Sequence, residues 1–350
     1  MTGPDAAWPL GPVTVLGAHI LDVLGRPVQE IPPGQGSVRL REIRVTAAGT
    51  AAGTAVDLAK LGARVRAVGA LGNDLIGDVV AAVLARHGVD TSALVRKHQV
   101  QTSATILPIR PNGERPALHV PGATSLFTRA DLDLDRALDG SRALVIGAPD
   151  ALTGMTGEDL AAVAAAARAR GALVAVDVLH PGRPRDLERL APLLATTDWF
   201  LPNGDQLLAL TGRTDLTAAI DDIKALGTRA VAVTLGGAGC LLAGPACGAP
   251  VALPALEVAV VDTTGCGDGF TAGLLAGLLL AAPHPGGPRP AGTDAVGTGP
   301  ADAAWLGLAC GALVATGLGS DAGIEDLGQV LDFLSATQPA VAGRIKEQIP

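Results

Sequence analysis

Short apolar runs alternate with helix-like segments along most of this 350-residue chain, and this alternation constrains the fold more than any other feature. The apolar runs are typical of buried parallel strands, because successive residues are apolar rather than every second one. These runs are Val13–Leu16, Val65–Val68, Ala143–Ile146, Leu173–Val178 and Ala230–Leu235. Helical patterns that reach a glycine near their ends lie at Thr54–Leu61, Asp74–Arg86 and Glu158–Arg170. The sequence therefore predicts an α/β fold, a doubly wound and mostly parallel sheet with helices on both faces.

Two stretches interrupt the alternation. Residues 24–46 are rich in Pro, Gly and Arg, and residues 100–123 carry the turn signal Asn112-Gly113 between two strand-like segments. Neither stretch can bury much surface alone, so we expect them to form a small β-sheet that folds over a single domain of residues 13–335. Residues 283–300 are dominated by Pro and Gly and predict a flexible surface insertion.

A glycine-rich turn lies between an expected strand at Ala255–Val261 and an expected buried helix at Phe270–Ala282. Such a turn presents backbone N–H groups at a helix N-terminus, where the helix dipole attracts phosphate. A carboxylate repels phosphate, so Asp268 in this turn is best explained as a base that takes a proton from an attacking alcohol. An ordinary turn is the alternative. A Rossmann site is disfavoured because Phe270 stands where a third glycine belongs, and the chain has no Gly-Lys dipeptide for a Walker A loop.

The segment Asp262-Thr-Thr-Gly-Cys-Gly-Asp268 resembles the C-terminal signature of the ribokinase-like, PfkB-type carbohydrate kinases. The resemblance runs from about residue 13 to about residue 332 and implies a ribokinase-like fold in which the small sheet is a lid over the sugar. It also implies that Asp268 is the catalytic base. The implied anion hole consists of the amides of Gly265, Cys266 and Gly267. Cys266 replaces the usual small residue, a minor change in a loop that works through its backbone.

Two further segments match the substrate side of this family only in part. Asp22 follows the first strand where the family places a sugar-binding Asp, and a carboxylate suits a polyol; a turn or cap residue is the alternative. In the glycine motif that contains Gly49 and Thr50, Gly53 replaces an Asn that touches a sugar hydroxyl. His119 precedes a segment that contacts substrate in the family. The resemblance thus implies a substrate site with Asp22, Gly49, Thr50, Gly53 and His119.

The nucleotide side of the family also has counterparts here. Thr234, Gly236 and Gly239 match the family's Thr-x-Gly-x-x-Gly nucleotide loop, although a simple hairpin explains the spacing alone equally well. Asn203 matches the first residue of an Asn-x-x-Glu motif that organises magnesium and phosphates through water. Gln206 replaces the Glu, so we expect weaker Mg²⁺ binding. The implied cofactors are ATP and Mg²⁺, together with K⁺ as an optional monovalent cation.

Composition limits the partners and the compartment. The formal charge of −8 and the pI near 5.2 argue against a nucleic-acid partner. The longest apolar stretch, Ala272–Ala282, is shorter than the roughly 20 residues that span a bilayer. The N-terminus lacks the pattern of a signal peptide, and the four cysteines show no Cys-x-x-Cys spacing. We therefore expect no membrane association and a cytoplasmic protein.

These observations predict an ATP-dependent kinase that phosphorylates a hydroxyl group of a small sugar or sugar derivative. A nucleoside kinase is the alternative. It is disfavoured because the chain has no Tyr, and residues 19–46 and 100–124 contain no Phe or Trp on which a base can stack. A protein that binds sugar or nucleotide without catalysis is a second alternative, disfavoured by the retention of Asp268.

The lid stretches carry two further signals. They hold five arginines, Arg39, Arg41, Arg44, Arg110 and Arg115, most of which we interpret as solvated charges of the lid. The alternative is that they meet a carboxylate or phosphate on an acidic sugar. Open strand edges in a lid favour pairing with a second copy, and the resembled family often dimerises through its lids. We therefore expect a homodimer through the lid.

Overall fold

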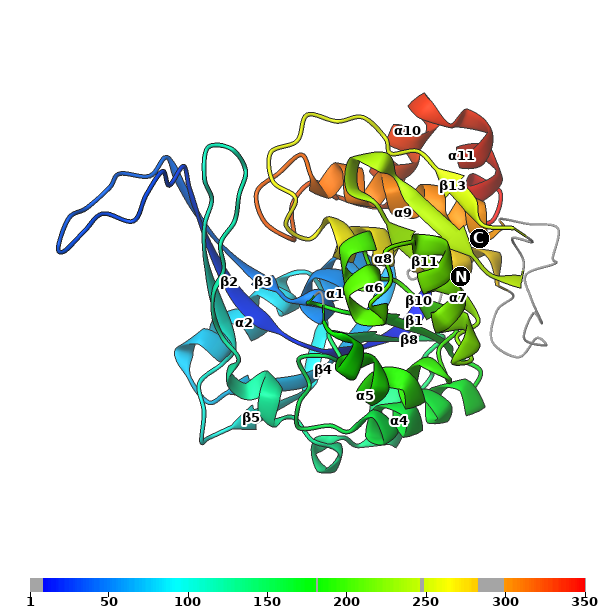
Figure 1. Ribbon diagram of the computed structural model, residues 1–350, viewed down its shortest axis with the longest axis horizontal. Helices are drawn as coiled ribbons and strands as arrows, with labels where there is room; N and C mark the ends of the chain where they lie inside the picture. Colours follow the sequence, from blue (N-terminus) through cyan, green and yellow to red (C-terminus); the bar gives the residue numbers. More distant parts are fainter. Residues whose placement is uncertain (1–8, 181, 246–248, 283–298, 350) are drawn as a thin grey trace, which may run out of the picture.

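The computed structural model describes residues 9–180, 182–245, 249–282 and 299–349 (Figure 1). Within these ranges one large sheet has the strand order β13-β12-β11-β10-β9-β8-β1-β4-β5. All neighbouring strands are parallel except β11–β12 and β12–β13, which are antiparallel. The strands are β1 (Gly11–Gly17), β4 (Ala63–Gly72), β5 (Asp90–Lys97), β8 (Ala143–Gly147), β9 (Leu173–Asp177), β10 (Trp199–Phe200), β11 (Ala230–Thr234), β12 (Cys240–Ala243) and β13 (Val251–Leu253). The predicted doubly wound, mostly parallel sheet is confirmed.

Helices cover both faces of this sheet (Figure 1). The helices of the first face, or packed on it, are α1 (Thr50–Lys60), α2 (Leu75–Arg86), α8 (Cys266–Ala281), α9 (Pro300–Val314), α10 (Leu327–Thr337) and α11 (Pro339–Lys346). Those of the second face are α3 (Leu134–Leu138), α4 (Gly157–Ala169), α5 (Pro184–Leu194), α6 (Gly204–Thr211) and α7 (Leu216–Ala225). On β8, Val145 lies in the first core and Leu144 and Ile146 in the second. Burial on both sides explains why the strands are continuously apolar.

The strand order reverses at β1, because the chain continues from β1 to its neighbour β4 and reaches β8, its other neighbour, only later. Ligands of open α/β sheets bind at such a switch point, beyond the carboxyl ends of the strands. Here those ends are Gly17 of β1 and Gly147 of β8, which pair directly. Helix α1 begins over them, since a Cβ on Gly147 would lie 2.7 Å from the amide nitrogen of Ala51. The fold therefore places the N-terminal turn of α1 at its natural ligand site.

A second, smaller sheet has the strand order β3-β2-β6-β7 and lies beside the main body (Figure 1). Its strands are β2 (Ile20–Arg26), β3 (Glu42–Ala48), β6 (Ala104–Pro108) and β7 (Leu118–Val120). The smaller sheet expected from the sequence is thus present, and β2 and β3 extend a few residues beyond the predicted stretch 24–46. In Figure 1 the loop between β2 and β3 reaches away from the body.

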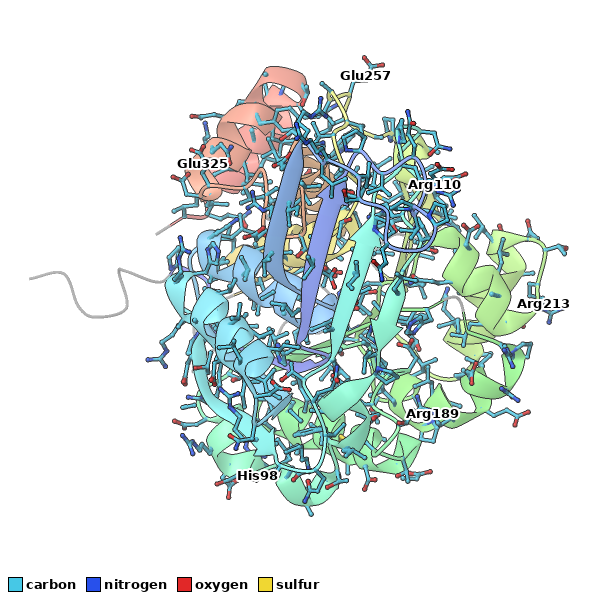
Figure 2. The ribbon with its side chains drawn as sticks, turned by 90° about the vertical axis from the view of Figure 1, so that its left-hand side faces the viewer. His98, Arg110, Arg189, Arg213, Glu257 and Glu325 are labelled. Carbon is cyan, nitrogen blue, oxygen red and sulfur yellow. The ribbon has the colours of Figure 1, made fainter. Side chains whose placement is uncertain are left out.

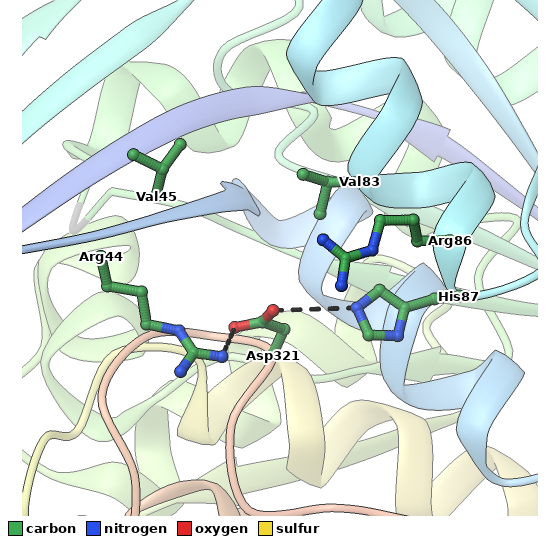
Figure 3. A pocket seen from close by; sticks show the side chains of 6 residues that line it. All are labelled: Arg44, Val45, Val83, Arg86, His87 and Asp321. Carbon is green, nitrogen blue, oxygen red and sulfur yellow. Dashed lines mark hydrogen bonds and ion pairs between the residues drawn. The ribbon is translucent and has the colours of Figure 1, made fainter.

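A charged cluster joins strand β3 to the helices behind it (Figure 3). The Arg44 guanidinium lies 3.0 Å from a carboxylate oxygen of Asp321, and the His87 imidazole lies 3.8 Å from the other. Although burial alone would raise it, interactions with His87 and Arg44 lower the pKa of Asp321 to about 2. The ionised carboxylate, in the loop after α9, therefore forms an ion pair with Arg44 of the small sheet at neutral pH and lies beside His87 at the end of α2.

One predicted strand is wrong. The sequence predicts that Ala255–Val261 enters the core, but β13 ends at Leu253 and residues 254–260 have no regular structure. Val260 is 63% exposed. Pro254 has no amide donor to continue the antiparallel ladder, so the chain leaves the sheet edge there.

Most of the predicted insertion at 283–300 lies outside the described residues, and α9 begins at Pro300. The predicted buried helix is confirmed as α8.

Asp57 is an unusual side chain in the first core. It lies on α1, is 0% exposed, and neither carboxyl oxygen has a hydrogen-bond partner among the described residues. A Cβ on Gly269 would lie 3.4 Å from Oδ2 of Asp57, so the carboxyl group is underneath the first turn of α8. Burial raises the pKa of Asp57 well above its usual value, although Lys60 acts in the opposite direction. The folded protein therefore keeps this carboxyl group protonated at pH values where an exposed Asp is ionised.

Replacement of Asp57 by Asn should flatten the dependence of stability on pH. Because the folded pKa lies above the unfolded one, Asp57 destabilises the fold progressively as pH rises, by about 1.4 kcal/mol per unit of difference. Thermal unfolding from about pH 5 to about pH 8, the range in which buried carboxyl groups titrate, should show a smaller loss of Tm for Asp57→Asn than for the wild type. Asp332→Asn, at an exposed ion pair with Lys346, serves as the control. Equal losses of Tm in all three proteins would contradict the inference.

Candidate active site

The first turn of α8 forms a small cradle of backbone donors. Gly265 caps the helix in the left-handed conformation with φ 82°, and Cys266 is the first helical residue. The Cys266 amide lies 3.5 Å from the carbonyl oxygen of Thr263, whereas the amides of Gly267 and Asp268 have no acceptor in the described part of the chain. A Cβ on Gly267 would meet only open space. Unpaired amides at the positive end of a helix are suited to an anion such as a phosphoryl group.

The Asp268 carboxylate lies against helix α1. A Cβ on Gly53 would overlap Oδ2 of Asp268, so the carboxylate occupies the space that a side chain at residue 53 would take. The group remains partly exposed. Desolvation, followed by the charges of Asp177, Asp57 and Asp22, raises the pKa of Asp268 well above its usual value. A carboxyl group with a raised pKa at the mouth of an anion cradle is suited to proton transfer.

The remaining residues of the glycine motif shape the same corner. Gly49 precedes α1 with φ 79°, and a Cβ there would lie 2.7 Å from the carbonyl oxygen of Ala18. Thr50 is the first residue of α1 and is buried. The structure thus places Gly53 against Asp268, with Gly49 and Thr50 one helical turn before it, while their contact with a substrate stays a prediction.

A polar row crosses the inner face of the small sheet. Asp22 on β2 pairs in register with Thr46 on β3 and Thr105 on β6, and Thr105 pairs with His119 on β7. The Thr105 hydroxyl lies 3.1 Å from Nδ1 of His119. Burial, opposed by the hydrogen bond with Thr105 and the charge of Arg115, raises the pKa of Asp22 to about 6. The two substrate residues predicted from the sequence, Asp22 and His119, therefore belong to one surface.

The predicted nucleotide residues lie along the same edge of the sheet, just beyond the carboxyl ends of β10 and β11. Asn203 and Thr234 form a parallel β-bridge, which brings the N-terminus of α6 next to the end of β11. Gly236 is exposed, with φ 55°, and a Cβ there would have no described atom within 4 Å. Gly239 lies in the turn into β12 with φ 96°, where a Cβ would overlap the carbonyl oxygen of Leu253. Gly236 is thus open to a ligand, and Gly239 serves the turn itself.

Gln206 points inward from α6. Its Oε1 accepts a hydrogen bond from the Asn203 amide at 2.8 Å, and its Nε2 donates to the carbonyl oxygens of Val178 and Leu179 at 2.9 and 3.2 Å. A glutamate could not donate these last two bonds. The replacement of Glu by Gln therefore has a structural use, because it fastens the loop after β9 to α6.

Sequence reasoning missed several charged residues near the site. Asp177 ends β9, accepts a hydrogen bond from Thr271 at 3.1 Å, and has its pKa raised to about 7 by burial. Asp150, in the loop after β8, accepts a hydrogen bond from the His180 imidazole at 2.9 Å, which raises the pKa of His180. Asp177 ends a parallel strand and Asp150 follows one, at the sheet edge where ligands of α/β folds bind. This position is the sequence signal by which both acids could have been identified.

The Cys266 thiol is an unreactive member of the loop. Burial raises its pKa to about 12, so the sulfur stays protonated at neutral pH. Its role in the cradle is through its backbone, as the sequence predicts.

The residues present fit ATP and Mg²⁺. The free amides at α8 suit the terminal phosphate, and the open turn at Gly236 admits the remainder of a nucleotide. In the ranges that the structure describes, no group of three His, Cys, Asp or Glu side chains can hold a metal ion by itself. Mg²⁺ commonly binds through one or two carboxylates together with substrate phosphates, so the nucleotide itself would complete its coordination.

Of the described helices, none is both long and apolar enough to cross a membrane.

Comparison with known proteins supports the same chemistry. The model of the pfkB family of carbohydrate kinases matches residues 13–327. A 2-dehydro-3-deoxygluconokinase of Bacillus subtilis is 27% identical over 83% of this chain and 86% of its own length. A fructokinase of Klebsiella pneumoniae is 30% identical over 77% of this chain and 84% of its own length.

A solved structure shares the fold. The ribokinase of Arabidopsis thaliana, complexed with ribose and ATP, has a TM-score of 0.73 at 22% identity and covers 92% of this chain and 98% of its own. The predicted ribokinase-like architecture is therefore confirmed. Because the family model spans most of the sequence, the chain belongs to the PfkB family of carbohydrate kinases and is an ATP-dependent sugar kinase.

Proposed function

We propose that this protein transfers the γ-phosphoryl group of ATP to a hydroxyl of a small sugar, with Asp268 as the general base. The observation that carries the proposal is the position of the Asp268 carboxylate at the N-terminus of α8, next to the unpaired amides of Gly267 and Asp268. In the reaction, the acceptor oxygen forms a bond to phosphorus as the bond to the ADP oxygen breaks. The hydroxyl proton passes to the ionised carboxylate of Asp268.

The other residues of the site bind and orient the reactants. The amides of Gly265, Cys266 and Gly267 form the anion hole, and among the described residues only the Cys266 amide already has an acceptor, the Thr263 carbonyl oxygen at 3.5 Å. Asp22 and the Gly49–Gly53 turn hold the sugar hydroxyls. Bound Mg²⁺ supplies positive charge that neutralises the phosphates. Asn203 and Gln206 would hold it through water, and its binding would be weaker than with a Glu, because the Gln206 carboxamide is neutral and already bonded to Asn203, Val178 and Leu179.

The inner face of the small sheet favours a sugar as the acceptor. Thr46, Asp22, Thr105 and His119 offer hydroxyl, carboxylate and imidazole groups, the partners that a polyol needs. The sheet segments contain no aromatic residue that can stack on a nucleobase. The curated relatives compared above are named as a fructokinase and a 2-dehydro-3-deoxygluconokinase, which supports the same class of acceptor.

We further propose that residues 13–335 act as one kinase unit in which the segments 24–46 and 100–123 close over the sugar as a lid. Closure of such a lid excludes water and limits wasteful hydrolysis of ATP. A kinase of this kind acts where ATP is available, which supports a cytoplasmic location.

Asp268→Asn should abolish turnover while the fold and ATP binding persist. Loss of a general base typically lowers the rate by about 10²–10⁴-fold. Formation of ADP should be measured with ribose, fructose, a keto-deoxy sugar acid and adenosine, with and without K⁺, and binding of ATP by thermal shift. Wild-type kcat in the variant would exclude Asp268 as the base. A kcat/KM for adenosine at least tenfold above that for every sugar, a difference of about 1.4 kcal/mol, would show that the acceptor is a nucleoside.

The outer face of the small sheet supports the homodimer expected from the sequence. Alternate residues of β3, β6 and β7 point away from the site and leave a continuous apolar surface. The exposed members are Ile43 (66%), Val45 (44%), Ile106 (56%), Leu118 (57%) and Val120 (43%). Figure 2 is viewed toward this sheet. Because an apolar face of this kind is unusual on a monomer, we propose that two copies pack lid against lid.

Ile106→Lys should convert the dimer into a monomer, since it places a charge at the centre of the apolar face. The control is Val38→Lys, which changes an equally exposed residue (51%) in the loop between β2 and β3. Light scattering at micromolar concentration should report dimers for the wild type and the control. A monomeric wild type, or a dimeric Ile106→Lys variant, would contradict the lid interface.

A further inference from the structure

Arg115 differs from the other arginines of the lid segments. Arg44 pairs with Asp321, Arg110 pairs with Glu114 in its own hairpin, and Arg39 and Arg41 are exposed. Arg115, in the hairpin between β6 and β7, instead reaches across to the signature loop that precedes α8. Its guanidinium donates a hydrogen bond to the Thr264 hydroxyl and lies 3.5 Å from Oδ1 of Asp262. It therefore connects the tip of the lid to the loop that holds the anion cradle.

Arg115 contacts the chain directly before the cradle, because Thr264 precedes Gly265, the cap of α8. Its charge also acts on Asp22, the expected sugar ligand, and on Cys266, the first helical residue of the cradle. The contact with Thr264 therefore brings a cation next to the expected phosphoryl site. Arg115 is also only partly exposed, whereas its neighbours Glu114 and Pro116 in the hairpin are exposed.

The charge balance of the site calls for such a cation. In the described part of the chain, no basic side chain acts on Asp268: the groups that do are Asp177 from β9, Asp57 from α1 and Asp22 from β2, which are acids and bring negative charge or none. A γ-phosphate in the cradle adds further negative charge to this group. Arg115 is the basic side chain that acts on Asp22 from the lid, and a guanidinium can hold phosphate oxygens in a bidentate manner without giving up its proton.

The present contacts of Arg115 can be exchanged without leaving Asp262 unpaired. Oδ1 of Asp262 also accepts hydrogen bonds from the amide and the hydroxyl of Thr264, at 3.1 and 2.9 Å. Its Oδ2 accepts one from the Gly319 amide at 3.0 Å. The carboxylate of Asp262 therefore keeps three hydrogen bonds when Arg115 turns toward another anion, so release of the guanidinium leaves neither of its oxygens without a donor.

We propose that Arg115 leaves Asp262 and Thr264 when the substrates bind and contacts the transferring phosphoryl group, so that the lid supplies a catalytic cation. The inference rests on the proposed function. Phosphorus gains its bond to the sugar oxygen and loses its bond to ADP, while the guanidinium stays protonated and stabilises charge on the phosphoryl oxygens. Closure of the lid over a sugar would then complete the catalytic site, which couples sugar binding to phosphoryl transfer.

The test compares Arg115→Ala and Arg115→Lys with Arg110→Ala, a control on the same hairpin whose side chain is paired at the surface (labelled in Figure 2). Loss of one donor to a transition state lowers kcat by about 10²–10³-fold, so Arg115→Ala should fall by at least that much. The KM for the sugar should change by less than about threefold, because the contact is made only in the transition state. Arg115→Lys should be intermediate, and Arg110→Ala should match the wild type.

A second readout does not depend on turnover. ADP with Mg²⁺ and aluminium fluoride, which imitates the phosphoryl group in transfer, should raise the Tm of the wild type and of Arg110→Ala more than ADP with Mg²⁺ does. Arg115→Ala should lose this additional shift. Retention of the shift in Arg115→Ala, or a kcat equal to that of Arg110→Ala, would overturn the inference. So would an effect confined to the KM of a sugar acid, since Arg115 would then bind the substrate carboxylate.

Failure of the proposed function would look different. A wild type that phosphorylates no sugar or nucleoside would contradict the kinase assignment of the site. The additional rise in Tm with aluminium fluoride would still show whether Arg115 contacts a group that occupies the phosphoryl position.

Discussion

The contact between Gly53 on α1 and Asp268 on α8 is the constraint on which the site depends. The Asp268 carboxylate fills the volume of the missing side chain at residue 53, so that a Cβ there would overlap its Oδ2. The replacement of the family's Asn by Gly53 therefore does more than remove an expected sugar ligand. It lets helix α1 approach the first turn of α8 closely, so that the base and the anion cradle share one corner at the switch point of the sheet. The lid strands then only have to bring the polar row of Asp22 over this corner.

The same corner concentrates acids. Asp22, Asp57 and Asp177 are buried, and burial raises the pKa of each by disfavouring its ionised form. The pKa of Asp268 is raised by desolvation and by these three acids. Such an arrangement weakens the ligand-free fold at neutral and higher pH, which is common where a site is built for function rather than stability. Positive charge offsets this loss of stability when the substrates bind, since Mg²⁺ comes with the nucleotide and Arg115 comes from the lid. Closure of the lid would therefore both neutralise the acids and complete the catalytic site.

Local patterns in the sequence were sufficient for strands β1, β4, β8, β9 and β11, for helices α1, α2, α4 and α8, for the small sheet and for the glycine turn before α8, because each depends on residues that are neighbours in the chain. They failed at Ala255–Val261, where apolar residues follow a proline at a sheet edge. They also could not find Thr105, whose place beside Asp22 is set by strand register. Arg115 was one of five lid arginines noted in the sequence, but the sequence could not single it out because its partners are more than a hundred residues away. For Gln206, the sequence indicated a weakened metal contact and missed the hydrogen bonds to the loop after β9.

A double-mutant cycle between residues 53 and 268 tests most directly whether the α1–α8 contact positions the base. Alanine has a higher helix propensity than glycine, so Gly53→Ala should not weaken α1 itself. It should push the Asp268 carboxylate aside and lower kcat by at least about tenfold, since a misplacement of about 1 Å can cost about 10²-fold. In an Asp268→Asn background the same change should have almost no further effect on kcat. An unchanged kcat for Gly53→Ala, or an equal loss in both backgrounds, would contradict the account.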